Sequence, residues 1–139
     1  MATSFDEIFE IFKEKITDYD LAKLIEGQVS RIFDIYLGSA CSYFHRKFPL
    51  VDLTRDKENR TFISSLDDDI IEILAIGMVY YWASPKAFAT DNITNIMQTK
   101  DFTDYSPANL LKALLAARDG AKREFRIAVI DYTYMPGKG

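Results

Sequence analysis

The chain has very little cysteine and histidine, the residues that supply much of enzyme and metal chemistry. Its 139 residues include one cysteine, Cys41, and one histidine, His45. A single cysteine cannot form a disulfide within the chain, and this suits a protein made in a reducing cytosol. One residue of each type is also a poor supply for a zinc site or a nucleophile–base pair. We interpret Cys41 as a small apolar helix residue and His45 as part of the basic end of a helix.

Signals for phosphate, metal and membrane binding are missing too. There is no glycine-rich phosphate loop, and the run Asp67, Asp68 and Asp69 lacks the spacing and the glycine of a calcium loop. Helix capping is therefore favoured over Mg²⁺ or Ca²⁺ binding for these aspartates, and we predict no cofactor and no enzyme. The longest nearly uncharged run, 70–83, is shorter than the ~20 residues of a bilayer crossing. The start of the chain has no basic region followed by a long apolar core, so we expect neither a secretory signal nor a membrane anchor.

Positive charge is not in excess. The chain has 17 basic and 21 acidic residues, which gives a net charge of −4. The whole excess lies in residues 1–20, where six acids stand against two lysines. Tight binding to nucleic-acid phosphates usually needs a clustered positive surface, so the sequence argues against sequence-specific nucleic-acid binding.

What the chain does have is apolar material for one core: 48% of its residues are hydrophobic and 14% are aromatic. Ile70 to Ala83 carries a single charge, Glu72. A helix that is apolar on all sides must be buried on all sides. Asp67 or Asp68 can cap its start, and Pro85 is expected to end it. We therefore predict an all-α fold, a small helical bundle around a buried central helix over about 68–83.

Two amphipathic helices are predicted before the central one. Ser4 and Glu7 form a capping box at the start of the first, over about 5–16. The second spans about 20–47, with Ile32 and Ile35 on its apolar face, and the sequence leaves open whether Gly27 divides it. Residues 49–65 are expected to form a polar connection that is either functional or contains a short turn of helix or strand.

A long helix is predicted near the C-terminus, over about 107–131, because Ser106 and Pro107 are typical of a helix start. Apolar residues from Leu110 to Ile130 continue its pattern, and its polar side carries Arg118, Lys122, Arg123 and Arg126. We treat 1–131 as a single helical domain and 132–139 as a C-terminal tail that docks on a partner.

Aromatic residues are frequent where loops or the tail are expected: Phe88, Phe102, Tyr105, Tyr132 and Tyr134. Aromatic residues and methionine suit protein interfaces because they bury a large area with few rotatable bonds. Phe88, Phe102 and Tyr105 either cover the ends of the bundle or form a ring or tail-side interface. For the tail we favour an interface, because a segment beyond the last helix has little of its own domain left to cover.

Three segments, taken together, resemble the head-to-tail adaptor (connector) proteins of long-tailed bacteriophages. They are Leu66–Trp82 (LDDDIIEILAIGMVYYW) followed by Pro85, Lys100–Leu111 (KDFTDYSPANLL), and Asp131–Tyr134 (DYTY). The resemblance implies a structural virion protein at the head–tail junction, assembled in the bacterial host cytoplasm. Such proteins form a ring, typically twelvefold, that binds beneath the portal, extends the DNA channel and offers a surface to the next neck or tail protein.

The resemblance also implies a portal-binding segment, because the C-terminal segment in that family commonly reaches toward the portal. Here it maps onto Asp131, Tyr132, Thr133, Tyr134, Met135 and Lys138, with the two tyrosines and the methionine as apolar anchors. DNA would pass through the channel without being gripped, and we hypothesise that acids of the first helix or of residues 52–58 face the lumen. Two alternatives stay open: another helical neck or tail-assembly factor, and a small helical regulatory module that binds a partner peptide or helix in a groove.

Overall fold

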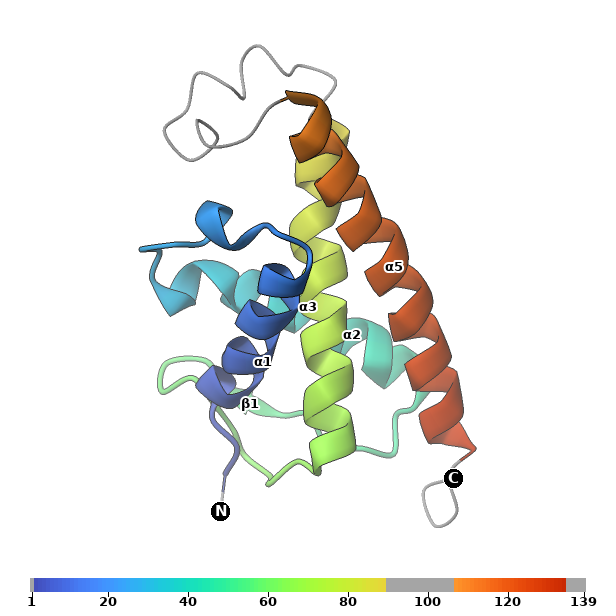
Figure 1. The fold of residues 1–139 in the computed structure, drawn as a ribbon. Helices are drawn as coiled ribbons and strands as arrows, with labels where there is room; N and C mark the ends of the chain where they lie inside the picture. The colour runs from blue at the N-terminus through green and yellow to red at the C-terminus, as the bar shows by residue number, and fades with distance from the viewer. Residues whose placement is uncertain (1, 90–106, 135–139) are drawn as a thin grey trace.

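The computed structural model describes residues 2–89 and 107–134. This part of the chain is a small helical bundle, which confirms the predicted all-α fold. Its helices are α1 (Phe5–Asp18), α2 (Asp34–Lys47), α3 (Asp68–Ala89) and α5 (Pro107–Thr133). Helix α3 runs through the centre, with α5 alongside it on one side and α1 on the other, and α2 crosses behind (Figure 1).

The start and the burial of α3 agree with the sequence. The Ile70 backbone N–H donates to Asp67 Oδ1 at 3.0 Å, so Asp67 caps the helix as expected. Side chains on every side of α3 are buried, and they include Ile70, Leu74, Met78, Val79 and Trp82. The central helix therefore belongs to the core over its whole apolar run.

The end of α3 differs from the prediction. Pro85 lies inside the helix, which continues to Ala89 instead of stopping near residue 83. Proline removes one backbone donor and disfavours a helical residue before it, but the buried side chains of Trp82 and Ala83 and the packing of α5 along α3 hold this segment helical. Phe88 consequently lies in a helix and not in a loop. Phe102 and Tyr105 lie outside the described residues.

Helix α1 begins at the predicted capping box. The Asp6 N–H donates to Ser4 Oγ at 3.1 Å, and the Ser4 N–H donates to Glu7 Oε2 at 2.9 Å. The apolar side of α1 is buried against α3 and against Phe33, and its residues are Phe5, Ile8, Phe9, Phe12 and Ile16. The acidic residues are left on the outward side of the helix.

The second predicted helix is divided at Gly27. A 3-10 turn, η1 (Ala22–Leu24), is followed by Gly27 with φ +78°, then by a second turn, η2 (Ser30–Phe33), which leads into α2. A positive φ is readily adopted by glycine, which has no Cβ to clash. The break shifts the helical register, so that Phe33 and Leu37 are buried while Ile32 and Ile35 are exposed. The prediction that Ile32 and Ile35 belong to the buried face is therefore wrong.

The connection between α2 and α3 contains a short antiparallel pair, β1 (Arg55–Asp56) and β2 (Thr61–Phe62). Arg60, in the turn between them, ties this hairpin to two helices. Its guanidinium donates to both carboxylate oxygens of Asp34 at 2.7 and 2.8 Å, and to Asp6 Oδ1 at 2.7 Å. This shared cation holds α1 and the start of α2 on the same side of the molecule.

Candidate interaction surface on α5

Helix α5 packs against α3 along one continuous row of buried side chains. The row recurs every three or four residues, as expected for one face of a helix: Leu110, Leu114, Ala117, Ala121, Phe125, Val129 and Tyr132. It continues to the last turn, and α5 ends only at Thr133. The helix is thus two residues longer than the sequence predicts.

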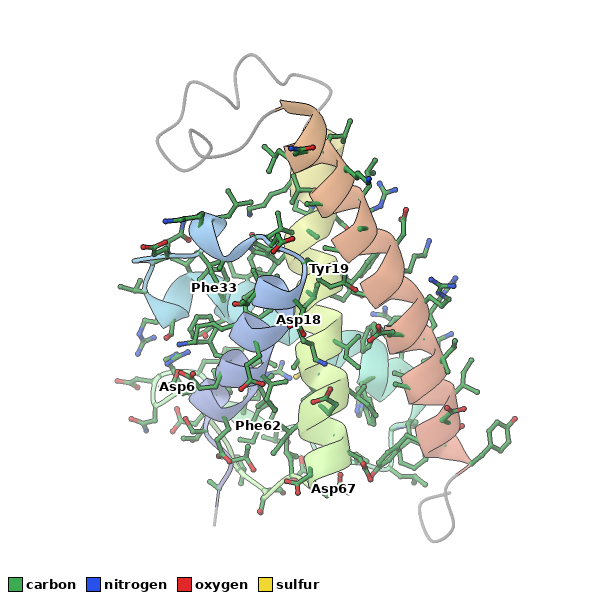
Figure 2. All side chains as sticks on the ribbon, viewed as in Figure 1. Asp6, Asp18, Tyr19, Phe33, Phe62 and Asp67 are labelled. Atoms are coloured by element: carbon green, nitrogen blue, oxygen red, sulfur yellow. The ribbon has the colours of Figure 1, made fainter. Side chains whose placement is uncertain are left out.

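Tyr132 is a correction to the predicted docking tail. It is buried within α5, and its ring meets Phe44 and Phe48 edge-on, with ring centres 5.5 and 5.3 Å away. Its hydroxyl donates to Asp67 Oδ2 at 3.2 Å. Asp67 lies at the start of α3, next to the C-terminal end of α5 (Figure 2). Tyr132 therefore fastens the last turn of α5 to its own domain and is not an exposed anchor. The spacing of Phe125, Val129 and Tyr132 is the signal in the sequence that places it in the core.

The outward side of α5 carries a row of exposed apolar residues. Ile127, Ile130 and Tyr134 have 52%, 55% and 83% of their surface exposed. Ile127 and Ile130 are three residues apart on one face of the helix, and Tyr134 follows directly after the helix ends at Thr133. The sequence counted Ile130 with the buried pattern, but Val129 takes the buried position. Exposed apolar residues that form a row, and are not scattered singly, are typical of an interaction surface.

A groove lies beside the end of this row, between α5 and α2. We call it the terminal groove; it has a volume of about 480 Å³ and is lined by Tyr43, Lys47, Arg126, Val129, Ile130, Thr133 and Tyr134. The ring of Tyr43 rests on Phe125, with the ring centres 4.8 Å apart, and Lys47 Nζ lies 5.6 Å from the Tyr43 ring centre. The groove therefore combines aromatic and aliphatic walls with two cations at its rim.

The other predicted contact residues are distributed around this groove. Thr133 lines the groove and its hydroxyl donates to the Ile130 carbonyl at 2.6 Å, whereas Asp131 is exposed on the same last turn. Tyr134 is the most exposed of them and follows directly after the helix. Met135 and Lys138 lie outside the described residues. The structure thus brings Ile130, Thr133 and Tyr134 together around one groove and removes Tyr132 from that surface.

Three cations, Lys122, Arg123 and Arg126, are exposed on α5 near Ile127. Among the described residues none of them has an ion-pair partner, in contrast to Arg118, which pairs with Asp119 at 2.8 Å. The neighbouring Glu124 lines a different hollow, shared with Lys15 and Tyr19. Burial, and to a lesser extent the negative charge of Glu124, raises the pKa of Tyr19. The outward side of α5 is therefore basic as well as apolar.

A second exposed apolar patch lies at the start of α2, and we call it the η2 patch. It consists of Val29, Ile32 and Ile35, with 65%, 50% and 75% of their surface exposed. Phe33, between them, turns inward and packs on Phe9 and Phe12 of α1, with ring centres 5.1 and 5.4 Å away. Sequence periodicity missed this patch because the break at Gly27 is what turns these residues outward.

The single cysteine and the single histidine both lie in α2. Cys41 is buried, and burial raises the pKa of its thiol to about 11, although Arg55 acts in the opposite direction. His45 is exposed at the basic end of α2. Within residues 2–89 and 107–134, no group of three or more histidines, cysteines and acids is arranged to hold a metal ion. None of the helices in these two ranges has the length and hydropathy of a bilayer-spanning segment.

No family model matches this chain, and neither a curated protein nor a solved structure matches it.

Proposed function

We propose that this chain is a structural virion protein, a head-to-tail adaptor that forms a ring beneath the portal, extends the DNA channel and connects it to the neck or tail. The observation that carries the proposal is the terminal groove, with Ile130 and the largely exposed Tyr134 at the end of the last helix. An aromatic residue presented next to a preformed groove is a typical centre of a protein–protein contact. The resemblance in residues 66–85, 100–111 and 131–134 supplies the kind of partner.

Docking on the portal would begin at the end of α5. Tyr132 is held by Phe44, Phe48 and Asp67, so the last turn is a rigid platform from which Tyr134 projects. Met135 and Lys138 follow Tyr134 in the sequence and extend the contact in this proposal. A rigid platform lowers the entropy cost of binding, because the portal has to order only the segment beyond it.

The groove also defines what the portal must offer. Tyr43, Val129 and Ile130 accept an apolar side chain, and Lys47 and Arg126 at the rim favour a carboxylate beside it. Once a subunit is docked, contacts between neighbouring copies close the ring. No reaction is assigned to the chain, and its role in this proposal is assembly.

The test is to mix the purified chain with portal rings and to image the particles by electron microscopy. We expect an added collar with the wild type, and its loss in the double variant Ile130→Ser, Tyr134→Ala. Deletion of residues 134–139 should also abolish the collar while leaving Tyr132 and the fold intact. The matched control is Leu50→Ala, which truncates a residue that is 74% exposed but lines a different hollow, formed by α2 and residues 49–55. Wild-type protein that adds no collar to portal rings would overturn the proposal.

A helical protein-binding module is the alternative from a different class, and another helical neck or tail-assembly factor is the alternative within the same class. The terminal groove supports the protein-binding module, because its apolar lining also suits a partner peptide or helix. The two classes differ in valency: a regulatory module binds its partner as a single copy, whereas the adaptor adds a ring of copies to the portal. Mass measurement of the complex separates them.

A further inference from the structure

The α5 surface N-terminal to Arg126 takes no part in the proposed docking on the portal. Lys122, Arg123, Arg126 and Ile127 border a shallow hollow of about 290 Å³, together with Asp119. Arg126 also lines the terminal groove, so we call Lys122, Arg123 and Ile127 the α5 basic face. Arg123, Ile127 and Ile130 are spaced by four and three residues, so they face outward in one row. Cations beside an exposed isoleucine require a partner that is both acidic and partly apolar.

The chain itself carries such a surface on α1. Asp6, Glu10 and Glu14 are exposed and follow one another at intervals of four residues, which places them in a row on the outward side of the helix. Glu10 pairs with Lys13 at 2.9 Å and Asp6 with Arg60 at 2.7 Å, both with more than half of the carboxylate side chain exposed. Glu14 has no ion-pair partner among the described residues.

Apolar surface lies next to this acidic row. Asp6 and Asp34 share Arg60, and Phe33 packs on α1, so the η2 patch of Val29, Ile32 and Ile35 lies on the same side of the molecule. Figure 2 shows Asp6 and Phe33 together on this side, across α3 from α5. An acidic row beside exposed valine and isoleucine complements the α5 basic face in both charge and hydrophobicity.

The two surfaces are not paired within one molecule: α1 and α5 approach each other where the Tyr19 hydroxyl lies next to Gly120, but among the described residues no ion pair joins the α5 basic face to an acid of α1. We propose that they meet between copies: the α5 basic face of one copy docks on the acidic row of α1 and the η2 patch of the next. Such a contact uses two different surfaces and is therefore heterologous, and it produces a ring when the rotation between copies closes. The inference rests on the proposed ring and identifies its lateral interface.

The proposal also assigns the acids of α1 to a subunit contact, in place of the lumen suggested by the sequence. A nucleic acid is a weaker candidate for the α5 basic face, because Ile127 interrupts the cations, Asp119 borders them, and the chain as a whole is acidic. Closely apposed like charges cost several kcal/mol at an interface, so reversing either charged row should prevent association.

The experiment uses complementary charge reversal in the full-length chain. Variant A is Lys122→Glu, Arg123→Glu, and variant B is Glu10→Lys, Glu14→Lys. Self-association is measured by sedimentation velocity over a concentration series, and circular dichroism checks that each variant is folded. We expect association of A alone and of B alone to be weaker than that of the wild type by tenfold or more. An equimolar mixture should recover it, because each acidic α5 then meets a basic α1 and each basic α5 meets an acidic α1.

A chain with all four substitutions should also recover association, since both charged rows are then reversed together. The matched control is Glu124→Lys, which changes charge on α5 but lies in the hollow with Tyr19, and it should leave association unchanged. A wild type that stays monomeric, or variants A and B that associate no better when mixed, would overturn the proposal.

The same variants on portal rings separate this inference from the proposed function. Complete collars formed by A or B alone would refute the lateral contact and leave the adaptor role standing, whereas absence of collars with the wild type would refute the adaptor role. If B forms intact collars but changes DNA ejection, the acids of α1 face the lumen. If the wild type binds duplex DNA and variant A does not, the α5 basic face is a nucleic-acid surface. Either of these results would also overturn the proposal.

Discussion

Gly77 lies where α3 is in close contact with both α2 and α5, and replacing it with alanine tests that packing. It lies in α3, facing α2 and α5. A Cβ at this position would lie 2.7 Å from the Ala40 Cβ and 2.8 and 2.9 Å from two ring carbons of Phe125. Because Ala40 cannot move without its backbone, and the Phe125 ring is packed against Tyr43, the added methyl group has no free space.

Two opposing effects determine the magnitude. Alanine is more favourable than glycine inside a helix by about 1 kcal/mol, whereas overpacking a core typically costs about 1–3 kcal/mol. Gly38→Ala in α2 provides the matched control, because nothing lies within 4 Å of its added Cβ. The helix-propensity gain is common to both variants and cancels in the comparison. We therefore expect the free energy of unfolding of Gly77→Ala to lie about 1–3 kcal/mol below that of Gly38→Ala.

The measurement is urea-induced unfolding followed by circular dichroism at 222 nm on both variants and the wild type. Gly38→Ala should be more stable than the wild type by up to about 1 kcal/mol, and Gly77→Ala equally stable or less so. Ala40→Gly removes the closest contact but has its own helix-propensity cost of about 1 kcal/mol, so it should destabilise Gly77→Ala less than it destabilises the wild type. Equal stability of Gly77→Ala and Gly38→Ala would refute the close packing of α2, α3 and α5.

Three further predictions concern the core and its titratable groups. Tyr132→Phe removes the hydrogen bond to Asp67 and should cost about 1 kcal/mol of unfolding free energy. Tyr132→Ala also removes the ring contacts and should cost about 3–5 kcal/mol. Similar losses for the two variants in urea titrations would contradict the buried position of the ring. Trp82→Ala should cost about 3–5 kcal/mol, because Trp82 is fully buried against Phe12; a loss below 1 kcal/mol in the same assay would contradict the central place of α3. Cys41 should make stability fall as pH rises from about 8.5 to about 11, since the unfolded thiol ionises near 8.5 while the buried thiol, whose pKa is about 11, keeps its proton. Cys41→Ala should remove this part of the pH dependence, up to about 1.4 kcal/mol per pH unit, and identical pH profiles of the two proteins would argue against a buried thiol.

The features that the sequence determined by itself are those that depend on neighbouring residues. The single charge between Ile70 and Ala83 was enough to make α3 the buried centre, because no orientation of that helix leaves it a polar face. The caps at Ser4 and Asp67 were also predictable, since a cap needs only a side-chain acceptor and backbone donors two or three residues away. The basic side of α5 could likewise be read from the spacing of its arginines.

Other features required contacts between residues far apart in the chain, and only the tertiary structure decided them. Helix α3 passes Pro85 because α5 packs along it, and Tyr132 is buried because Phe44 and Phe48 lie opposite it. Ile32 and Ile35 point outward because the break at Gly27 rotates the segment that follows. The placement of α1 and α5 along different sides of α3, with Tyr19 next to Gly120, also could not be predicted from the sequence. Periodicity and capping act within a few residues, whereas the faces that meet, and those left exposed, follow from the packing of the whole bundle.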